Sequence, residues 1–459
     1  MICRSLLAFI SCLLLWSGAA AQQSPTFKFL RYDEDYAYLK GDTLKGYEKI
    51  KFIPLGKQLK SYFSVGGELR LQYFYNHHED WGEAPKDKDG YTLSRYLLHA
   101  DLHSGRLFRA FIQLQSSMAS GRLSPSPVEA NPLGLHQAFI DLYPIHGEKA
   151  RLTLRLGRQE LMYGSQRLVS VREAPNNRQS FDGARGIFEL KTARAEAFYA
   201  DYVQVREGIF DDKWLNQDTR LWGLYLTKKD LPMIENIDVY YFGLSKKGAR
   251  YNDALGTEWR HSLGARVFGA KKHLKYDLEG LYQFGDIADK TIAAWTASMN
   301  TSYQLSHLRL QPEIGLKAEL ISGDSHKNDQ RLGTFNPLFP KGAYFGLAAL
   351  IGPANLTDLH PSLSLKLYPN LSFVTDFDMF WRYSKKDGIY AVNMRPIYGD
   401  MASDEKYIGD QLTGALIFTP TPFLYFRAEC TYFQAGSYLK EVGPGKDILF
   451  TGLTAQLKF

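Results

Sequence analysis

The sequence has few cysteines, no long apolar run beyond its N-terminus and no strong excess of either charge. Only 3 of its 459 residues are cysteine. Cys3 and Cys12 fall in an N-terminal leader, so Cys430 is left without a partner for an internal disulfide. No later segment has the ~18 consecutive apolar residues of a spanning helix. The 55 Lys and Arg residues against 49 Asp and Glu give a net charge of +6, too weak to indicate nucleic-acid binding.

Residues 1–21 have the pattern of a secretory signal peptide. Arg4 supplies the positive start, Leu6 to Trp16 the short apolar run, and Ser17 to Ala21 the small residues before a cut at Gln22. Aromatic residues are abundant, with 29 Tyr and 28 Phe. An exported, aromatic-rich chain without spanning helices is either a secreted globular β protein or a transmembrane β-barrel.

From residue 64 onward, apolar and polar residues alternate in segments of about ten residues, the length of a membrane-spanning strand. Between Ser64 and Tyr75, for example, Leu69 and Leu71 alternate with Glu68 and Arg70. Such alternation predicts strands with one apolar and one polar face. The predicted strands are 64–75, 94–103, 106–115, 135–143, 151–158, 183–190, 193–203, 219–227, 236–244, 259–269, 273–284, 293–305, 307–320, 361–368, 371–383, 409–419, 422–433 and 447–459.

The connections between these strands alternate in length. The short ones include 104–105, 191–192, 270–272, 306, 369–370 and 419–422. The long ones are 76–92, 117–134, 159–182, 204–218, 245–258, 321–360, 384–408 and 434–446. Turns at one end and long loops at the other are typical of an outer-membrane barrel, with the turns periplasmic and the loops extracellular.

The predicted fold is therefore all-β: a transmembrane antiparallel up-and-down β-barrel of about 18 strands over residues 64–459. Residues 22–63 form a periplasmic extension or a segment inside the lumen, and the pattern does not choose between them. The chain ends on Phe459, and a terminal aromatic residue on an amphipathic strand resembles the signal read by the barrel-assembly machinery. That machinery and outer-membrane lipid are expected partners.

An arginine-rich stretch from Gly157 to Leu190 lies between two predicted strands. Arginine binds carboxylates with a planar fork and stays charged, so this stretch suggests a place where an anion is handled. The alternative is a solvated loop whose arginines pair with its own Glu160, Glu173 and Asp182. Basic and acidic residues are nearly balanced on the polar strand faces, so this stretch and its neighbours hold the main local excess of positive charge. The residues expected to set selectivity are Arg158, Arg167, Arg172, Arg178, Arg185, Asp182, Arg109 and Arg155.

Several of these residues lie in segments that resemble the alginate-export family of outer-membrane porins. The segments are GRQELMYGSQRL at 157–168, RQSFDGAR at 178–185, RLGTFNPLFPKGAYF at 331–345, LIGPANLTDLHPS at 350–362 and FWRY at 380–383. The resemblance implies an 18-stranded barrel whose extracellular loops fold inward around an electropositive path for the polyuronate alginate. The residues that carry over inside the motifs are Arg158, Arg167, Arg178, Arg185 and, as a partner of an arginine, Asp182.

Other classes of function find weaker support. No Gly-x-Ser-x-Gly or His-Glu-x-x-His motif of a hydrolase occurs, although a catalytic triad needs no fixed spacing. His77 to Asp80 and Gly323 to Asp329 are weak candidates for metal binding. We therefore expect no catalytic residue, metal or cofactor, and no nucleic-acid partner.

The sequence predicts a passive channel in the bacterial outer membrane for an anionic polysaccharide or acidic oligosaccharide. A periplasmic delivery protein is left open as a partner. The alternatives are a general diffusion porin without preference for polyanions and, in another class, an outer-membrane hydrolase.

Overall fold

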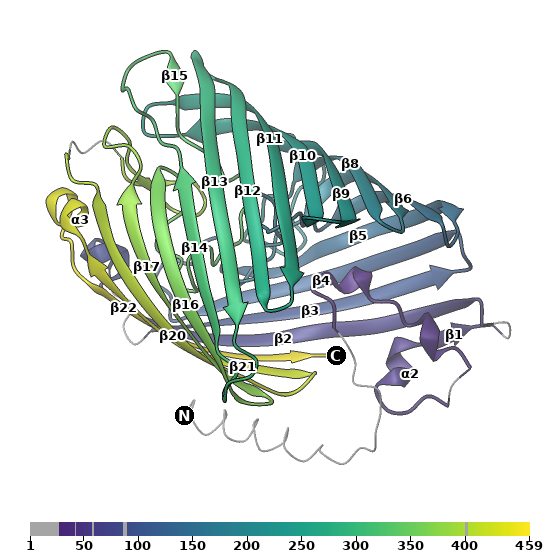
Figure 1. Cartoon of the computed structure of the whole chain (residues 1–459). Coiled ribbons are helices and arrows are strands. Elements are labelled where there is room, and N and C mark those ends of the chain that lie inside the picture. The colour runs from purple at the N-terminus through teal and green to yellow at the C-terminus, as the bar shows by residue number, and fades with distance from the viewer. Residues whose placement is uncertain (1–26, 42, 57–58, 86–89, 400–402) are drawn as a thin grey trace.

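The computed structural model describes residues 27–41, 43–56, 59–85, 90–399 and 403–459, and these form a closed antiparallel β-barrel (Figure 1). The described residues contain one 20-stranded sheet, of which two strands are short side strands and 18 are long. The barrel closes where the first long strand, β2 (Ser61–His77), pairs with the last, β22 (Ile448–Lys458). Closure leaves no open sheet edge, as hydrocarbon requires.

The 18 long strands correspond in order to the 18 predicted ones. They are β2 (Ser61–His77), β3 (Tyr91–Ser104), β4 (Phe108–Ser120), β5 (Asn131–His146), β6 (Ala150–Gln159), β7 (Phe181–Leu190), β8 (Ala193–Tyr202), β9 (Thr219–Leu231), β10 (Glu235–Arg250), β11 (Leu255–Lys271), β12 (Leu274–Ile287), β13 (Lys290–Gln304), β14 (Glu313–Ile321), β16 (Leu356–Tyr368), β17 (Leu371–Arg382), β20 (Tyr407–Thr421), β21 (Leu424–Ala435) and β22 (Ile448–Lys458).

Short elements complete the described part of the chain. They are η2 (Arg31–Asp33), η3 (Ala37–Leu39), α2 (Glu48–Lys51), β1 (Ile53–Leu55), η4 (Glu79–Gly82), β15 (Arg331–Leu332), β18 (Ile389–Tyr390), β19 (Pro396–Tyr398) and α3 (Ser437–Val442). Among the described residues, no helix has the length and apolar character needed to cross a membrane.

The strands separate an apolar outer face from a polar inner one. On β9, Leu224 and Leu226 are exposed on the outside, whereas Leu221 and Tyr225 are buried on the inside. Cys430 is exposed on the outer face of β21. Alternating residues point to opposite faces of a strand, so one face of every strand can meet lipid while the other lines the lumen.

The connections are long at one end of the barrel, with two corrections to the prediction. The connection expected to be long at 245–258 is only 251–254, and β12 and β13 are joined by 288–289 alone. In both places the strands continue past the apolar band, so β10 to β13 form a high wall (Figure 1). The strand predicted at 307–320 begins only at Glu313, because residues 305–312 form the turn before it.

Part of the N-terminal segment enters the barrel. Arg31 donates hydrogen bonds to the carbonyl oxygens of Gly67, at 3.0 Å, and Phe459, at 2.8 Å. The hydroxyl of Tyr32 donates to the carbonyl of Glu160 at 2.9 Å, and β1 pairs with the start of β2. The predicted signal peptide, residues 1–21, lies outside the described residues.

The assignment of the outer face to lipid leads to a prediction about a charge placed on that face. Leu453 lies at the middle of β22 and is 57% exposed. Leu453→Arg should lower the free energy of unfolding in lipid vesicles by about 2–4 kcal/mol, the cost of a cation at the bilayer midplane. Ser364→Arg is the control, because Ser364 lies opposite Glu313 on the lumen face. Urea titration measures both, and equal losses would contradict the assignment of the two faces.

Candidate functional site

Two extracellular loops fold into the lumen and join one another there. The first inner loop, residues 160–180, connects β6 and β7, and the second inner loop, residues 322–355, connects β14 and β16. Val169 and Phe339 form a parallel β-bridge between the loops. The amide of Ser170 donates to the carbonyl of Phe339 at 2.9 Å, and the amide of Phe339 donates to the carbonyl of Leu168 at 2.8 Å. The joined loops form a crossbar that narrows the lumen.

Aromatic side chains hold the first inner loop against the barrel wall. Tyr163 stacks on Phe198 of β8, with ring centroids 5.2 Å apart, and on Tyr225 of β9, at 5.1 Å. Phe339 of the second loop packs edge-on against Phe181 at 5.0 Å. Each buried aromatic ring removes a large apolar area from water, so these contacts stabilise the inward position of both loops.

The second inner loop continues to the opposite wall. Phe345 packs against Phe380 of β17, with centroids 5.1 Å apart. Gln411 of β20 donates to the carbonyl of Phe345 at 2.7 Å, and the amide of Leu347 donates to Glu429 of β21 at 3.2 Å. The crossbar therefore spans the barrel from the β8–β9 side to the β20–β21 side.

Besides Arg158 and Asp182, three of the predicted selectivity residues lie on the strands, buried and paired with carboxylates. The pairs are Arg109 with Asp101 (2.7 Å), Arg155 with Asp141 (2.7 Å) and Arg185 with Glu196 (2.5 Å). The N-terminal segment covers two of them: Arg109 donates to the carbonyl of Tyr32, and Arg155 lies 4.1 Å from the centre of the Tyr32 ring. These arginines bind the wall and the N-terminal segment together.

Arg158 pairs with Asp182 and holds a neighbouring loop. Its Nε lies 2.7 Å from Asp182 Oδ1, and its guanidinium lies 4.2 Å from the centre of the Trp214 ring. Asp182 also accepts from the amide of Leu215 at 3.0 Å. The pair thus fixes the loop at 203–218 to the ends of β6 and β7.

Arg167 ties the first inner loop to the far wall and to the second inner loop. It donates to the hydroxyl of Tyr344 at 2.8 Å and to Thr296 of β13 at 3.0 Å, and it lies 3.1 Å from Glu319 of β14. Burial by itself lowers the pKa of Arg167, but Tyr344 and the carboxylates of Glu319 and Glu279 raise it well above its usual value. Arg167 therefore remains charged.

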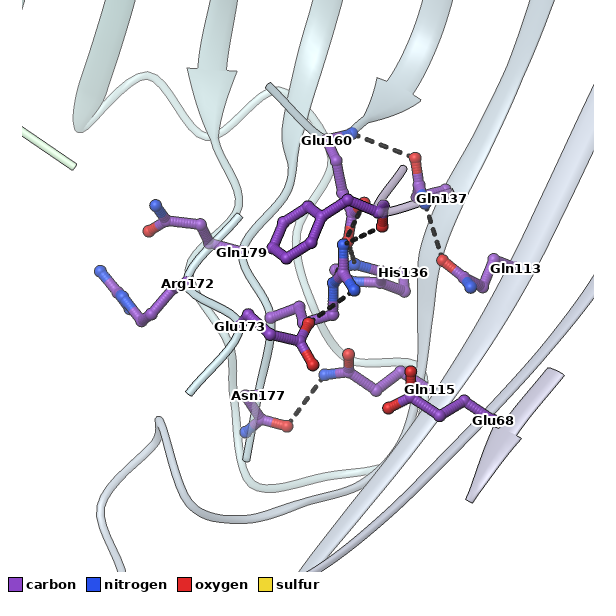
Figure 2. Close-up of polar contacts among 12 residues, drawn as sticks. Glu68, Gln113, Gln115, His136, Gln137, Glu160, Arg172, Glu173, Asn177 and Gln179 are labelled. Atoms are coloured by element: carbon purple, nitrogen blue, oxygen red, sulfur yellow. Dashed lines mark hydrogen bonds and ion pairs between the residues drawn. The ribbon is translucent and has the colours of Figure 1, made fainter. Parts of the chain in front are cut away.

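Arg178 pairs with two carboxylates in a cluster of polar residues between the first inner loop and the wall. Figure 2 labels Glu160, Glu173 and His136 of this cluster. The Nε of Arg178 lies 2.6 Å from Glu160, and its Nη1 lies 2.7 Å from Glu173. His136 of β5 is also hydrogen-bonded to Glu160 at 2.7 Å. Burial alone raises the pKa of Glu160, but Arg178 and the His136 hydrogen bond bring that pKa below its usual value. The cluster keeps the loop docked as an ion-paired unit.

Arg172 differs from every other predicted arginine. It is half-buried, and its guanidinium has no hydrogen-bond or ion-pair partner among the described residues. Figure 2 shows Arg172 pointing away from Glu160 and Glu173. A side chain at Gly342 would meet Arg172, so the two inner loops are in contact here. Lys341 precedes Gly342 on the second loop, and its amide donates to the carbonyl of Gln166 on the first loop at 3.2 Å.

Lys341 was not singled out from the sequence, nor were Arg70 and Arg95. Lys341 lies 5.4 Å from the centre of the Tyr344 ring, and burial, with repulsion from Lys317, lowers its pKa to about 8. Arg70 and Arg95 reach from β2 and β3 to the first inner loop. Lys341 lies within segment 331–345, which resembles the alginate-export family, and this resemblance could have pointed to it. For Arg70 and Arg95, the sequence indicated only that they lie on the polar face of a predicted strand.

The structure does not support metal binding at either of the two candidate segments, His77 to Asp80 and Gly323 to Asp329. Among the described residues, no three His, Cys, Asp or Glu side chains are grouped so as to hold a metal ion. Glu79 instead pairs with Arg122 at 2.6 Å, and Asp324 accepts hydrogen bonds in the second inner loop.

Comparisons with known proteins agree with this architecture. A family model described as "Alginate export" matches residues 61–446. OccD3 (OpdP) of Pseudomonas aeruginosa is similar in structure at 14% identity, covering 90% of this chain and 93% of that one, with a TM-score of 0.57. OccK3 (OpdO) of the same organism is 11% identical, with 86% of this chain and 95% of that one covered and a TM-score of 0.56. A BenF-like porin from Pseudomonas fluorescens Pf-5 is 8% identical, with 86% of this chain and 98% of that one covered and a TM-score of 0.57. No curated protein matches the chain.

The attachment of the crossbar through Arg167 leads to a prediction. Arg167→Met leaves buried Glu319 with one fewer cation and should lower the free energy of unfolding by about 3 kcal/mol, as for other broken buried ion pairs. The loosened crossbar should also give a larger and noisier single-channel conductance. Arg151→Met is the control: Arg151 is exposed and lies 4.0 Å from Glu189, so its loss should cost less than about 1 kcal/mol. Unchanged conductance in Arg167→Met would contradict the crossbar.

Proposed function

Because the chain belongs to the alginate export family and forms an outer-membrane β-barrel channel, we propose that it passes an anionic polysaccharide or acidic oligosaccharide by passive diffusion. The family and the porin fold indicate a channel rather than an enzyme. The family description supports a polysaccharide substrate, and the proposed solute is an alginate-like polyuronate.

One observation carries the preference for anions. Arg172 lies where the two inner loops meet at Gly342, and Lys341 is the residue before Gly342. Neither cation has a carboxylate within ion-pair distance among the described residues. Cations at a constriction attract anions and repel cations. Polyuronates carry one carboxylate per sugar, so a passing chain would present successive charges to this pair.

The arginines that are paired with carboxylates have a different part in the proposal. Arg167 and Arg178 are neutralised by carboxylates and hold the crossbar in place. Arg158 and Arg185 are likewise neutralised by Asp182 and Glu196. The selective charge is then a small surplus on a rigid support, rather than a continuous lining of arginines.

That neutralisation also favours a second candidate, a general diffusion porin. If the surplus at Arg172 and Lys341 is screened by salt, a channel whose other charges are paired would discriminate little between anions and cations. Selectivity measurements separate the two candidates. The proposal also includes two partners, the barrel-assembly machinery and a periplasmic protein that delivers the solute.

Arg172 provides the direct test of anion preference. A unit charge about 10 Å from a permeating ion contributes on the order of 1 kcal/mol at an effective dielectric constant of about 20 to 30. Arg172→Glu changes the charge by two units, so the anion-to-cation permeability ratio should fall at least roughly fivefold. Reversal potentials across a planar bilayer in a KCl gradient measure this ratio.

The matched control for Arg172 is Arg206→Glu. Arg206 is exposed on the loop at 203–218, outside both inner loops, so the same change of charge there should leave the reversal potential nearly unchanged. Equal shifts in both variants, or none in Arg172→Glu, would favour the general porin.

Lys341 predicts a dependence on pH. Its pKa is lowered to about 8, so the side chain is mostly charged at pH 7 and mostly neutral at pH 9. Block of the ion current by oligomannuronate should therefore weaken as the pH rises through about 8. Lys341→Arg keeps the charge and should remove this dependence, since arginine stays protonated. The same loss of block in Lys341→Arg would show that another group is responsible.

A further inference from the structure

Three buried arginines converge on one carboxylate of the first inner loop. Arg178 Nη1 lies 2.7 Å from Glu173 Oε2, Arg95 donates to Glu173 Oε1, and Arg70 Nη1 lies 3.7 Å from the same oxygen. The arginine side chains are at most 4% exposed, whereas that of Glu173 is 30% exposed. Figure 2 draws Glu173 in the same group of polar side chains as Glu160 and His136. A carboxylate that is open to the lumen thus occupies a buried pocket of guanidinium groups.

The other two carboxylates of the cluster are fixed to the wall. Glu68 lies on β2 and pairs with Arg95 at 2.6 Å, and Glu160, the first residue after β6, pairs with Arg178 at 2.6 Å. Both are nearly fully buried. Three arginines face two wall carboxylates, so the pocket has one positive charge too many unless a third carboxylate enters it from the lumen.

The pocket keeps its shape without the Glu173 side chain. The backbone carbonyl of Glu173 accepts from Arg70 at 2.7 Å and from Arg95 at 3.0 Å, and the carbonyl of Pro175 accepts from Arg70 at 2.9 Å. These bonds hold the guanidinium groups of Arg70 and Arg95, and Glu160 holds that of Arg178, wherever the Glu173 carboxylate points. Arg70 Nε is buried and has no hydrogen-bond partner among the described residues, so the pocket retains unused donor capacity.

We propose that the pocket of Arg70, Arg95 and Arg178 is a binding site for the carboxylate of a uronate residue, and that Glu173 occupies it as a tethered competitor when the channel is empty. The substrate class rests on the proposed function. The exchange is non-covalent: one carboxylate replaces another, and the charge of the pocket is conserved. Arginine forks suit this exchange because they bind carboxylates through two parallel hydrogen bonds.

A tethered competitor suits transport of a polyanion. A conducting site must bind well enough for the solute to enter and weakly enough for it to leave. In the absence of Glu173, the three guanidinium groups would hold a polyuronate too firmly. Phe29 of the N-terminal segment lies beside the pocket, with its 41% exposed ring 5.4 Å from the Arg178 guanidinium. A carboxylate site next to an apolar ring matches a sugar acid, which has a carboxylate and an apolar C–H face.

The test is the affinity for tetramannuronate, measured by isothermal titration calorimetry on the full-length mature barrel in detergent. Glu173→Gln removes the competing charge and keeps the size of the side chain, so the Kd should fall about tenfold, which corresponds to ~1.4 kcal/mol. Neutral mannotetraose should bind no more tightly to the variant than to the wild type. An unchanged or higher Kd for tetramannuronate in Glu173→Gln overturns the proposal.

Two further variants keep the result specific to the pocket. Glu79→Gln removes a partly buried glutamate that is ion-paired on another extracellular loop, and should leave the Kd unchanged. Arg70→Met added to Glu173→Gln should abolish the gain in affinity, because Arg70 has no carboxylate within hydrogen-bond distance and its loss strands none. A gain that persists without Arg70 also overturns the proposal.

The outcomes separate this inference from the proposed function. A cation-preferring wild-type channel whose Glu173→Gln variant still gains affinity would overturn the proposed function alone. An anion-preferring channel whose Kd for tetramannuronate is the same in the wild type and in Glu173→Gln would overturn only the proposed role of the pocket. Absence of tetramannuronate binding by both proteins would overturn the pocket as a uronate site. Far-UV circular dichroism and heat-modifiable migration confirm that each variant is folded.

Discussion

Hydrogen bonding of the backbone in hydrocarbon is the constraint on which this structure depends. The pairing of β2 with β22 closes the sheet, so each long strand has a neighbour on both sides. Closure fixes one face of every strand toward lipid and the other toward the lumen. The polar side chains of the strands are then collected on one inner surface, where they must satisfy one another, the inner loops or the solute.

Ion pairs across that inner surface position the loops. A buried ion pair adds little net stability, because desolvation offsets the attraction, but loss of one partner leaves a costly unpaired charge. Pairs such as Arg158–Asp182 and Arg178–Glu160 therefore act mainly by excluding other loop positions. Once these pairs are made, the proposed function rests on two further features. Arg172 and Lys341 are cations without an ion-pair partner among the described residues, and Glu173 is a carboxylate shared by three arginines.

The sequence predicted the strands well because alternation is local, and lipid imposes it on each strand separately. It predicted the connections at β10 to β13 poorly, since strands that rise above the membrane no longer alternate strictly and look like loops. Arg172 and Arg178 cannot be distinguished by residue type or spacing, because their difference arises only when the loop folds and Arg178 meets Glu160. Arg70 and Arg95 were missed for a similar reason: their partner Glu173 is distant in sequence and comes to them through the inner loop.

Transport itself tests the central claim most directly. Proteoliposomes that contain the wild-type channel would be supplied with tetramannuronate and, separately, with neutral mannotetraose, and the initial entry rates would be compared with those of protein-free vesicles. The account predicts faster entry of the charged tetramer than of the neutral one, although the two are similar in size. Equal rates, or faster entry of the neutral tetramer, would contradict it.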